Sequence, residues 1–283
     1  MAVKNADFEY LRKLIRDRSA IVLEPGKEYL IESRLAPLAR REGYDSLEEM
    51  VASMRSSHFN ELHRKVIEAM TTNETTFFRD LQPFEMLKKN LIPDLIEKRK
   101  TERKLNVWSA ACSSGQEPYS IAMLIREHFP MLTSWDVHLL ATDISQEMVD
   151  RTREGRYNQI EISRGLPTPL LTKYFNKHGP QWQIANELRR MIEVRELNLA
   201  HDWGHMRPMD IIFMRNVMIY FDTEMKRVIL RKLRELLKPG GFLILGAAET
   251  TMNLDQSFAR VQFDTSFCYQ LPKQLEKAKT PSK

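Results

Sequence analysis

"NVWSAACSSGQEPYS", residues 106–120, has the form of a buried strand that runs through a turn into a helix. In an open α/β sheet, ligands bind beyond the carboxyl ends of the strands, and the first strand-to-helix turn usually forms part of the site. A dinucleotide-binding turn carries G-x-G-x-x-G, because pyrophosphate needs bare backbone beside it. This turn has a single glycine, Gly115, preceded by Cys112, Ser113 and Ser114. The sequence therefore disfavours pyrophosphate and favours a ligand that carries adenosine and an amino acid without phosphate.

Strands and helices alternate from about residue 104 onward. The strands are apolar enough to be covered on both faces, which is typical of a parallel sheet with helices on both sides. A hairpin over 259–271 is expected to add an antiparallel edge. The expected strands span 105–111, 136–143, 192–198, 210–216 and 241–248, and the helices between them include 118–129, 146–155 and 222–237. These patterns predict an α/β fold with a Rossmann-like, mostly parallel sheet.

Two other parts of the chain differ from this rhythm. Apolar residues recur at helical spacing up to about residue 70, which predicts a small all-α N-terminal domain. Residues from about 166 to 200 are more typical of a small inserted β-subdomain than of another crossover unit. The C-terminal stretch "KQLEKAKTPSK", residues 273–283, is polar and of low complexity, so we expect a disordered tail there.

Composition excludes several classes of protein. No window approaches the roughly 18 apolar residues of a membrane span, and the N-terminus has neither an apolar signal region nor a cleavage site, so we expect a cytoplasmic protein. Cys112 and Cys268 lie far apart, which argues against a disulfide framework and a zinc site. The net charge of +5 lies partly in the C-terminal stretch and is otherwise mixed with acids. It is weak support for a nucleic-acid partner.

Acidic residues stand at the carboxyl ends of the first two strands. Glu117 at the start of the helix after the turn suits an ammonium group and is a poor neighbour for a phosphate; the alternative is a first-turn acid stabilised by the helix dipole. Asp143 ends the strand at 136–143, where an acid can accept the ribose hydroxyls of a nucleoside. Its alternative is an N-cap for the next helix.

Polar residues also close two later strands. Arg215 and Asn216 stand where the strand at 210–216 ends, before an apolar run through Tyr220, and Asn198 ends the strand at 192–198. Such residues commonly line a site, and a plain turn with core aromatics is the alternative. The stretch "LKPGGFLILGAAET" adds a helix, a Pro-Gly-Gly stop and a buried strand.

The most unusual stretch is "TTNETTFFRD", residues 71–80, at the junction of the helical part and the sheet. It concentrates ligand-binding polar side chains, two aromatic residues and a guanidinium. An interdomain linker with a helix cap is the alternative, but a linker has no need of Phe-Phe-Arg.

In order and spacing, five stretches resemble the CheR family of chemotaxis receptor glutamate O-methyltransferases. They are "NETTFFRD", "WSAACSSGQEPYSIAM", "ATDIS", "RNVMIYF" and "LKPGGFLILGAAET". The resemblance covers nearly the whole chain. It implies a helical domain over 1–72 that meets the receptor, and a class I methyltransferase domain over 73–273 that binds S-adenosylmethionine. The β-subdomain at about 166–200 is inserted in the latter, and a polar tail occupies 274–283.

The resemblance also assigns the site residues. Those that contact the cofactor, which leaves as S-adenosylhomocysteine, are Asn73, Thr75, Arg79, Glu117, Asp143, Asn198, Leu199, Arg215 and Asn216. Arg79 and Tyr220 face the reacting carboxylate and position it, with no metal. A glutamate side chain has an unperturbed pKa of about 4.3, so it is already ionised at neutral pH and needs no general base.

The implied partner is the cytoplasmic helical bundle of methyl-accepting chemotaxis receptors. Arg34, Arg40 and Arg41 are candidates to meet it, with a solvated helix face as the alternative. Family members that tether to a receptor pentapeptide have a longer glycine-containing loop in the β-subdomain; here that stretch is short, with only Gly179, which speaks against tethering. We expect a monomer that binds no nucleic acid and does not enter the membrane. A methyltransferase acting on another protein or RNA, and a non-catalytic S-adenosylmethionine-binding signalling protein, remain alternatives.

Overall fold

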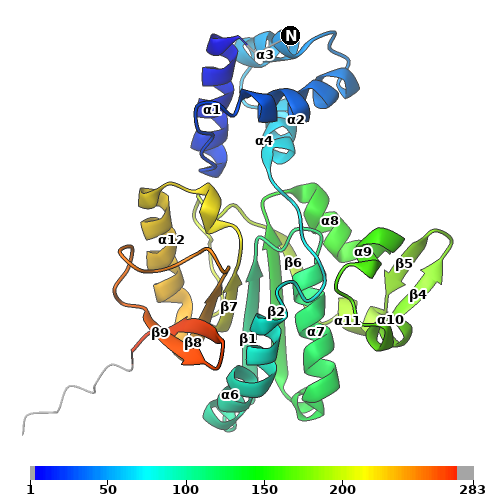
Figure 1. Ribbon diagram of the computed structural model, residues 1–283, viewed down its shortest axis with the longest axis vertical. Coiled ribbons are helices and arrows are strands. Elements are labelled where there is room, and N and C mark those ends of the chain that lie inside the picture. The colour runs from blue at the N-terminus through cyan, green and yellow to red at the C-terminus, as the bar shows by residue number, and fades with distance from the viewer. Residues whose placement is uncertain (1–3, 273–283) are drawn as a thin grey trace, which may run out of the picture.

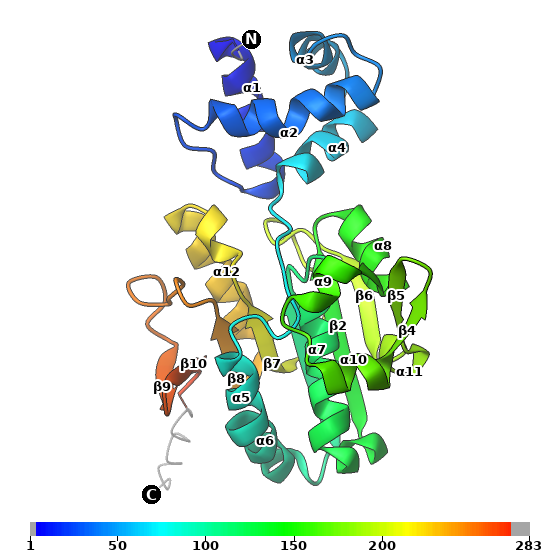
Figure 2. The same cartoon turned by 45° about the vertical axis from the view of Figure 1, so that its right-hand side comes forward.

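The computed structural model describes residues 4–272. The C-terminal stretch 273–283, which we expected to be disordered, lies outside the described residues. The chain forms a small helical part and a larger part built on a sheet. Figure 1 and Figure 2 show them stacked end to end, joined by an extended segment that follows α4.

The described residues of the N-terminal part form four helices, in line with the expected all-α domain. They are α1 (Asn5–Ser19), α2 (Glu28–Arg41), α3 (Leu47–Ser56) and α4 (Glu61–Met70). Their apolar stripes meet in a core of their own, which includes the fully buried Leu11, Ile31 and Met50. The prediction of an all-α unit is therefore confirmed, since apolar residues at helical spacing face one another here.

The main sheet has seven strands in the order β6-β2-β1-β7-β8-β10-β9. The first five are parallel, and β10 pairs antiparallel with both β8 and β9, as predicted. The strands are β1 (Lys104–Ala110), β2 (Asp136–Asp143), β6 (Ile192–Glu196), β7 (Met209–Met214), β8 (Leu237–Leu245), β9 (Ala259–Phe263) and β10 (Ser266–Gln270). The order reverses direction at β1, whose neighbours are β2 and β7, so the switch point lies where the first turn was expected to bind its ligand.

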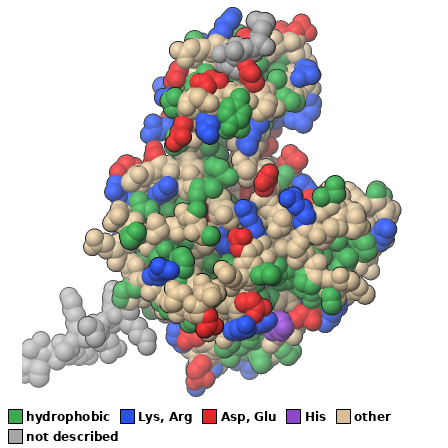
Figure 3. Space-filling model, viewed as in Figure 1, with side chains coloured by type: hydrophobic (Ala, Val, Ile, Leu, Met, Phe, Trp, Pro, Cys, Tyr) green, Lys and Arg blue, Asp and Glu red, His purple; other side chains and the backbone are tan. Residues whose placement is uncertain are grey.

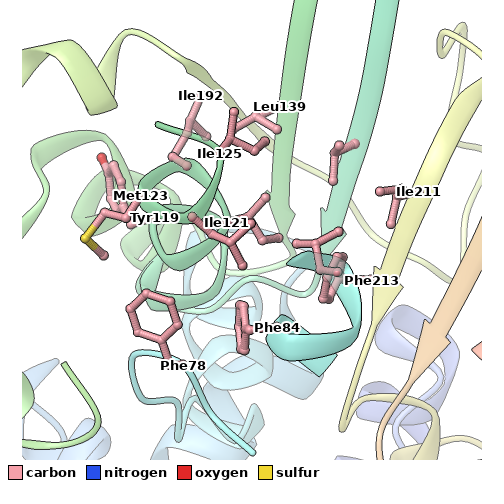
Figure 4. Close-up of a cluster of buried hydrophobic side chains, with 14 of the residues drawn as sticks. Phe78, Phe84, Tyr119, Ile121, Met123, Ile125, Leu139, Ile192, Ile211 and Phe213 are labelled. Atoms are coloured by element: carbon pink, nitrogen blue, oxygen red, sulfur yellow. The ribbon is translucent and has the colours of Figure 1, made fainter. Parts of the chain in front are cut away.

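Helices cover both faces of this sheet because successive strand residues point to opposite sides. On one face Val107 and Phe213 pack against α7 (Gln116–His128) and the segment before β1, and Figure 4 shows Phe84 and Ile121 in that cluster. On the other face Trp108 packs with α12 (Thr223–Leu236). The remaining crossover elements are α8 (Gln146–Glu154) and the short helical turns η2 (Pro130–Ser134) and η3 (Met218–Tyr220).

Residues 82–99 form a helical segment that the strand-and-helix pattern did not predict. It consists of α5 (Gln82–Met86), a π-helical turn η1 (Leu87–Leu91) and α6 (Ile92–Arg99). Pro83 and Pro93 lie near the starts of α5 and α6, where proline is tolerated, but they interrupt the helical signal in the sequence.

The strand expected at 241–248 also begins earlier. β8 already includes Lys-Pro-Gly-Gly, because Leu237 pairs with Met209 across an irregular register.

The inserted subdomain is displaced from the expected 166–200. Its sheet has the order β3-β5-β4, formed by β3 (Arg156–Asn158), β5 (Gln181–Ile184) and β4 (Phe175–His178), with α9 (Gln159–Ser163), α10 (Thr168–Tyr174) and α11 (Asn186–Arg189) beside it. Strand β6, inside the expected range, belongs to the main sheet. A three-residue strand such as β3, with one buried residue, is too short to show a period in sequence.

Arg34 of α2 joins the helical part to the connecting segment. Its guanidinium donates to the carbonyl oxygens of Met70 and Thr71 at 2.7 and 2.9 Å, and to the Thr72 hydroxyl at 2.9 Å. The earlier expectation treated Arg34 as a receptor contact or as part of a solvated face. The structure shows Arg34 half-buried, with its donors at the carboxyl end of α4, so the solvated face is wrong for this residue and its receptor contact stays a prediction. Arg40 and Arg41 are exposed.

We predict that Arg34→Ala lowers the free energy of unfolding by about 1–3 kcal/mol, because it leaves carbonyls at the end of α4 without charged donors. Urea unfolding followed by circular dichroism measures this change. Arg41→Ala on the same helix is the control, and we expect a change within about 0.5 kcal/mol. Equal stability of the two variants would contradict the capping role of Arg34.

Candidate active site

One cavity lies at the carboxyl ends of β1, β2 and β7, below the helical domain. It encloses about 920 Å³ of empty space, part of it open to solvent, at the edge of the sheet where open α/β folds bind their ligands. Every residue assigned to the site in the sequence lines it: Asn73, Thr75, Arg79, Glu117, Asp143, Asn198, Leu199, Arg215, Asn216 and Tyr220. The structure thus brings together residues from five separate stretches of sequence.

The turn after β1 bends sharply with only one glycine. Ala111, Ser113 and Gly115 have φ values of 53°, 51° and 92°, all in the left-handed region. A Cβ on residue 115 would lie 2.8 Å from Cγ2 of Thr152, so this position excludes a side chain. The Ser113 N–H donates to Oδ2 of Asp143 at 2.8 Å, and this bond helps to hold the turn in its bent form.

Asp143 is buried at the end of β2 and aims into the cavity. Its carboxylate accepts N–H bonds from Ser113 and Ser145 at 2.8 and 3.0 Å. The side chain that caps α8 is Ser145, which accepts from the Met148 N–H, so the N-cap alternative for Asp143 is wrong. Burial raises the pKa of Asp143 above its ordinary value, while the N–H bonds act in the opposite direction. A carboxylate has about four acceptor positions, so two remain for hydroxyl donors.

Glu117 and Arg215 form a buried ion pair beside the cavity. The Glu117 carboxylate accepts from the Ser109 hydroxyl at 2.8 Å and from Nη1 of Arg215 at 3.0 Å. Nη2 of Arg215 donates to Asp80 at 2.7 Å and to the Arg79 carbonyl at 3.0 Å. Glu117 is therefore more than a first-turn acid, because it joins the start of α7 to the end of β7.

Two donors near the cavity have spare capacity. Within residues 4–272, Nε of Arg215 is buried without a hydrogen-bond partner. The half-buried Arg79 spends one N–H on the Glu74 carbonyl, at 3.0 Å, and a guanidinium has five such donors. Tyr220 is also half-buried and lines the same cavity from the turn η3 after β7. Because Arg79 lines the cavity with donors to spare, the arrangement fits a ligand with oxygen or nitrogen acceptors.

The helical domain contributes residues that the sequence did not reveal. Ser19, the last residue of α1, and Ile21, two residues further on, line the cavity. Ile21 forms a β-bridge with Phe221, and the Val22 N–H donates to the Tyr220 carbonyl at 2.9 Å. No local pattern signals these contacts, because they join residues about 200 positions apart.

Asn198 takes part in the same interdomain contact. Its amide nitrogen donates to the Arg18 carbonyl at 2.6 Å, and its amide oxygen accepts from the Ala200 N–H at 2.9 Å. The side chain therefore already has partners at both ends, and its predicted cofactor contact stays a prediction.

Several absences hold for residues 4–272 alone. They contain no group of three or more His, Cys, Asp or Glu residues that could hold a metal ion, and no helix long and apolar enough to cross a membrane. Cys112 and Cys268 are free and buried, and burial raises the pKa of both thiols.

The sheet with this switch point, and a cavity lined by Glu117 and Asp143 after a turn unsuited to pyrophosphate, are typical of a class I methyltransferase. Residues 6–71 match the family description "CheR methyltransferase, all-alpha domain", and residues 73–267 match "CheR methyltransferase, SAM binding domain". The chain belongs to the CheR methyltransferase family, and its cofactor is S-adenosylmethionine.

Curated relatives of nearly equal length support this assignment. The chain is 41% identical over 274 residues to "Chemotaxis protein methyltransferase 1" of Pseudomonas aeruginosa, covering 95% of this chain and 99% of the relative. It is 40% identical over 275 residues to "Chemotaxis protein methyltransferase Cher2" of Pseudomonas putida, with the same coverage. A Vibrio parahaemolyticus "Chemotaxis protein methyltransferase" is 37% identical over 276 residues, again covering 95% and 99%.

The residues present fit this cofactor. Asp143 has free acceptor positions for the ribose hydroxyls, and Glu117 has them for an ammonium group. The free donors of Arg79 suit a carboxylate. These individual roles are predictions that follow from where each group lies in the cavity.

We predict that Asp143→Ala weakens S-adenosylhomocysteine binding about tenfold to a hundredfold, because a hydrogen bond to a charged group contributes about 1.5–3 kcal/mol. Titration calorimetry measures this affinity. Asp150→Ala is the matched control, since Asp150 is exposed on the following helix and, among the described residues, bonds Gln146 and Arg153 at its surface. Unchanged affinity in the Asp143 variant would refute the ribose assignment.

Proposed function

We propose that this protein transfers a methyl group from S-adenosylmethionine to glutamate side-chain carboxylates of chemoreceptors, giving glutamyl methyl esters. One observation carries the proposal: Arg79 and Tyr220, from two distant segments, line the same cavity as the residues assigned to the cofactor. A guanidinium and a phenol can position a carboxylate, and a protein that only binds the cofactor has no need of them.

The proposed chemistry needs positioning rather than proton transfer. S-adenosylmethionine supplies an electrophilic methyl group on its sulfonium. The acceptor carboxylate is ionised at neutral pH, so no side chain has to remove a proton. Arg79 would hold one carboxylate oxygen through charge-assisted hydrogen bonds, and Tyr220 would fix the orientation of the group. Very strong hydrogen bonds from Arg79 would make the carboxylate oxygen a weaker nucleophile. Because Arg79 already donates one N–H to the Glu74 carbonyl, fewer of its donors are free to bind the carboxylate.

The proposed partner is the cytoplasmic helical bundle of a chemoreceptor, which would place the protein in the cytoplasm. Arg40 and Arg41 are exposed at the end of α2 and are candidates to meet an acidic bundle. The visible face in Figure 3 mixes Lys and Arg with Asp and Glu, so it offers no single-sign patch for nucleic acid. The turn between β4 and β5 consists of Gly179 and Pro180 alone, which supports action without pentapeptide tethering. We propose a monomer as the working form.

The assay that tests this function uses labelled S-adenosylmethionine and a receptor cytoplasmic fragment. We expect label in the fragment that base releases as methanol, because esters hydrolyse and N-methyl groups do not. A fragment with its acceptor glutamates replaced by glutamine should take up no label. Base-stable label, or label in RNA alone, would favour the alternative methyltransferases, and no transfer at all would favour a binding protein.

We predict that Arg79→Ala lowers kcat/KM about a hundredfold while the fold survives, because a misplaced reacting group costs about that factor. Steady-state methyl transfer measures the change, and thermal unfolding checks the fold. Arg227→Ala is the control: Arg227 is exposed on α12 and pairs only with Glu224. Near-normal kcat/KM in the Arg79 variant would remove Arg79 from the mechanism.

A further inference from the structure

Glu249 is a buried carboxylate that the sequence did not single out. It lies in the turn after β8, and its side chain forms no ion pair within residues 4–272. Four backbone N–H groups bind it instead. Oε2 accepts from Gly246 and Asn216 at 2.7 and 2.9 Å, and Oε1 accepts from Val217 and Ile219 at 2.9 and 3.3 Å. A charge removed from water needs such partners, so the two turns are built around this side chain.

These bonds connect the turns that follow two neighbouring strands. Asn216, Val217 and Ile219 follow β7, while Gly246 follows β8. A Cβ on residue 246 would lie 2.8 Å from Oε2 of Glu249 and 2.9 Å from the Asn216 nitrogen, so glycine permits the close approach. The carboxylate thereby fixes the backbone path immediately after the last residues of β7.

That path leads directly to Tyr220. Asn216, Val217 and Tyr220 line the cavity. Tyr220 comes directly after Ile219, whose N–H donates to Glu249. From the opposite side, the Val22 N–H holds the Tyr220 carbonyl. The segment is thus fixed by a buried carboxylate on one side and by the helical domain on the other.

We propose that Glu249 is a positioning residue for methyl transfer, which acts by fixing residues 216–219 and so the place of the Tyr220 hydroxyl at the cavity. This inference rests on the proposed function, in which Tyr220 orients the acceptor carboxylate. Glu249 itself does not line the cavity, so its effect on the reaction is indirect.

Glu249→Gln tests this role with almost no change of shape. An amide accepts at its oxygen only, so its NH₂ would face two backbone N–H donors that the carboxylate now satisfies. We expect kcat to fall about tenfold to a hundredfold, as for a displaced reacting group. KM for the receptor fragment should change much less. The Kd for S-adenosylhomocysteine should rise by a smaller factor than kcat falls, because the displaced segment holds Asn216 of the predicted cofactor contacts while Asp143 and Glu117 stand on other elements. Glu249→Asp, whose shorter side chain withdraws the acceptor, should lower kcat as well.

Asp255→Asn is the matched control. Asp255 lies in the same β8–β9 connection, accepts the Ser257 N–H at 2.8 Å and pairs with Arg234 at 3.1 Å, but makes no bond to residues 216–219. We expect a lower Tm and an unchanged kcat. A purely structural Glu249 would give the same result as this control.

Hydrogen exchange supplies a second measurement that needs no substrate. In Glu249→Gln the Val217 and Ile219 amides should exchange faster than in the wild type, while in Asp255→Asn they should not. Wild-type kcat in folded Glu249→Gln, or unchanged exchange at these amides, would overturn the inference. If the wild-type protein does not methylate receptor fragments, the proposed function fails on its own, and the exchange data still decide whether Glu249 holds the segment.

Discussion

The buried guanidinium of Arg215 is the contact on which the site depends. It ties together the end of β7, the start of α7 through Glu117, and the connecting segment through Asp80 and the Arg79 carbonyl. Taking charges out of water is costly, so such a network persists only when its geometry satisfies most of its groups. Because it fixes three parts of the chain at once, the cavity wall has one arrangement rather than several.

The charges around this guanidinium also explain the choice of ligand. Three acids, Glu74, Glu117 and Asp143, and two bases, Arg79 and Arg215, line the cavity. A fourth acid, Asp80, pairs with Arg215 beside it. S-adenosylmethionine carries a sulfonium, an ammonium and one carboxylate, so its net charge of +1 complements a site in which acids outnumber bases. A dinucleotide carries two negative phosphates, which would be repelled by the excess of acids at the site.

The sequence was sufficient for the parts of the fold that repeat a local pattern. Four of the five parallel strands contain a buried apolar run, while the edge strand β6 has one buried residue. Each of the five was found within about four residues of its bounds, including the stretch that became β1. The motif residues at the strand ends, such as Asp143 and Arg215, were found because parallel strands bring their carboxyl ends to one edge. Contacts between distant segments leave no such pattern in the sequence, so Ser19 and Ile21 were missed. The role of Glu249 was missed as well, because its partners are backbone N–H groups, which every residue except proline has.

The turn after β1 shows how a site without phosphate is built. Only Gly115 is a glycine, yet Ala111 and Ser113 also adopt left-handed backbone angles, a conformation that costs non-glycine residues of order 1–3 kcal/mol each. The Ser113 N–H is satisfied by Asp143, so the same hydrogen bond that holds the strained turn also orients the carboxylate at the end of β2. In a glycine-rich phosphate turn the free N–H groups point at the ligand. Here the N–H is turned inward to an acid, which presents acceptors to the cavity and leaves it suited to hydroxyl and ammonium donors rather than to an anion.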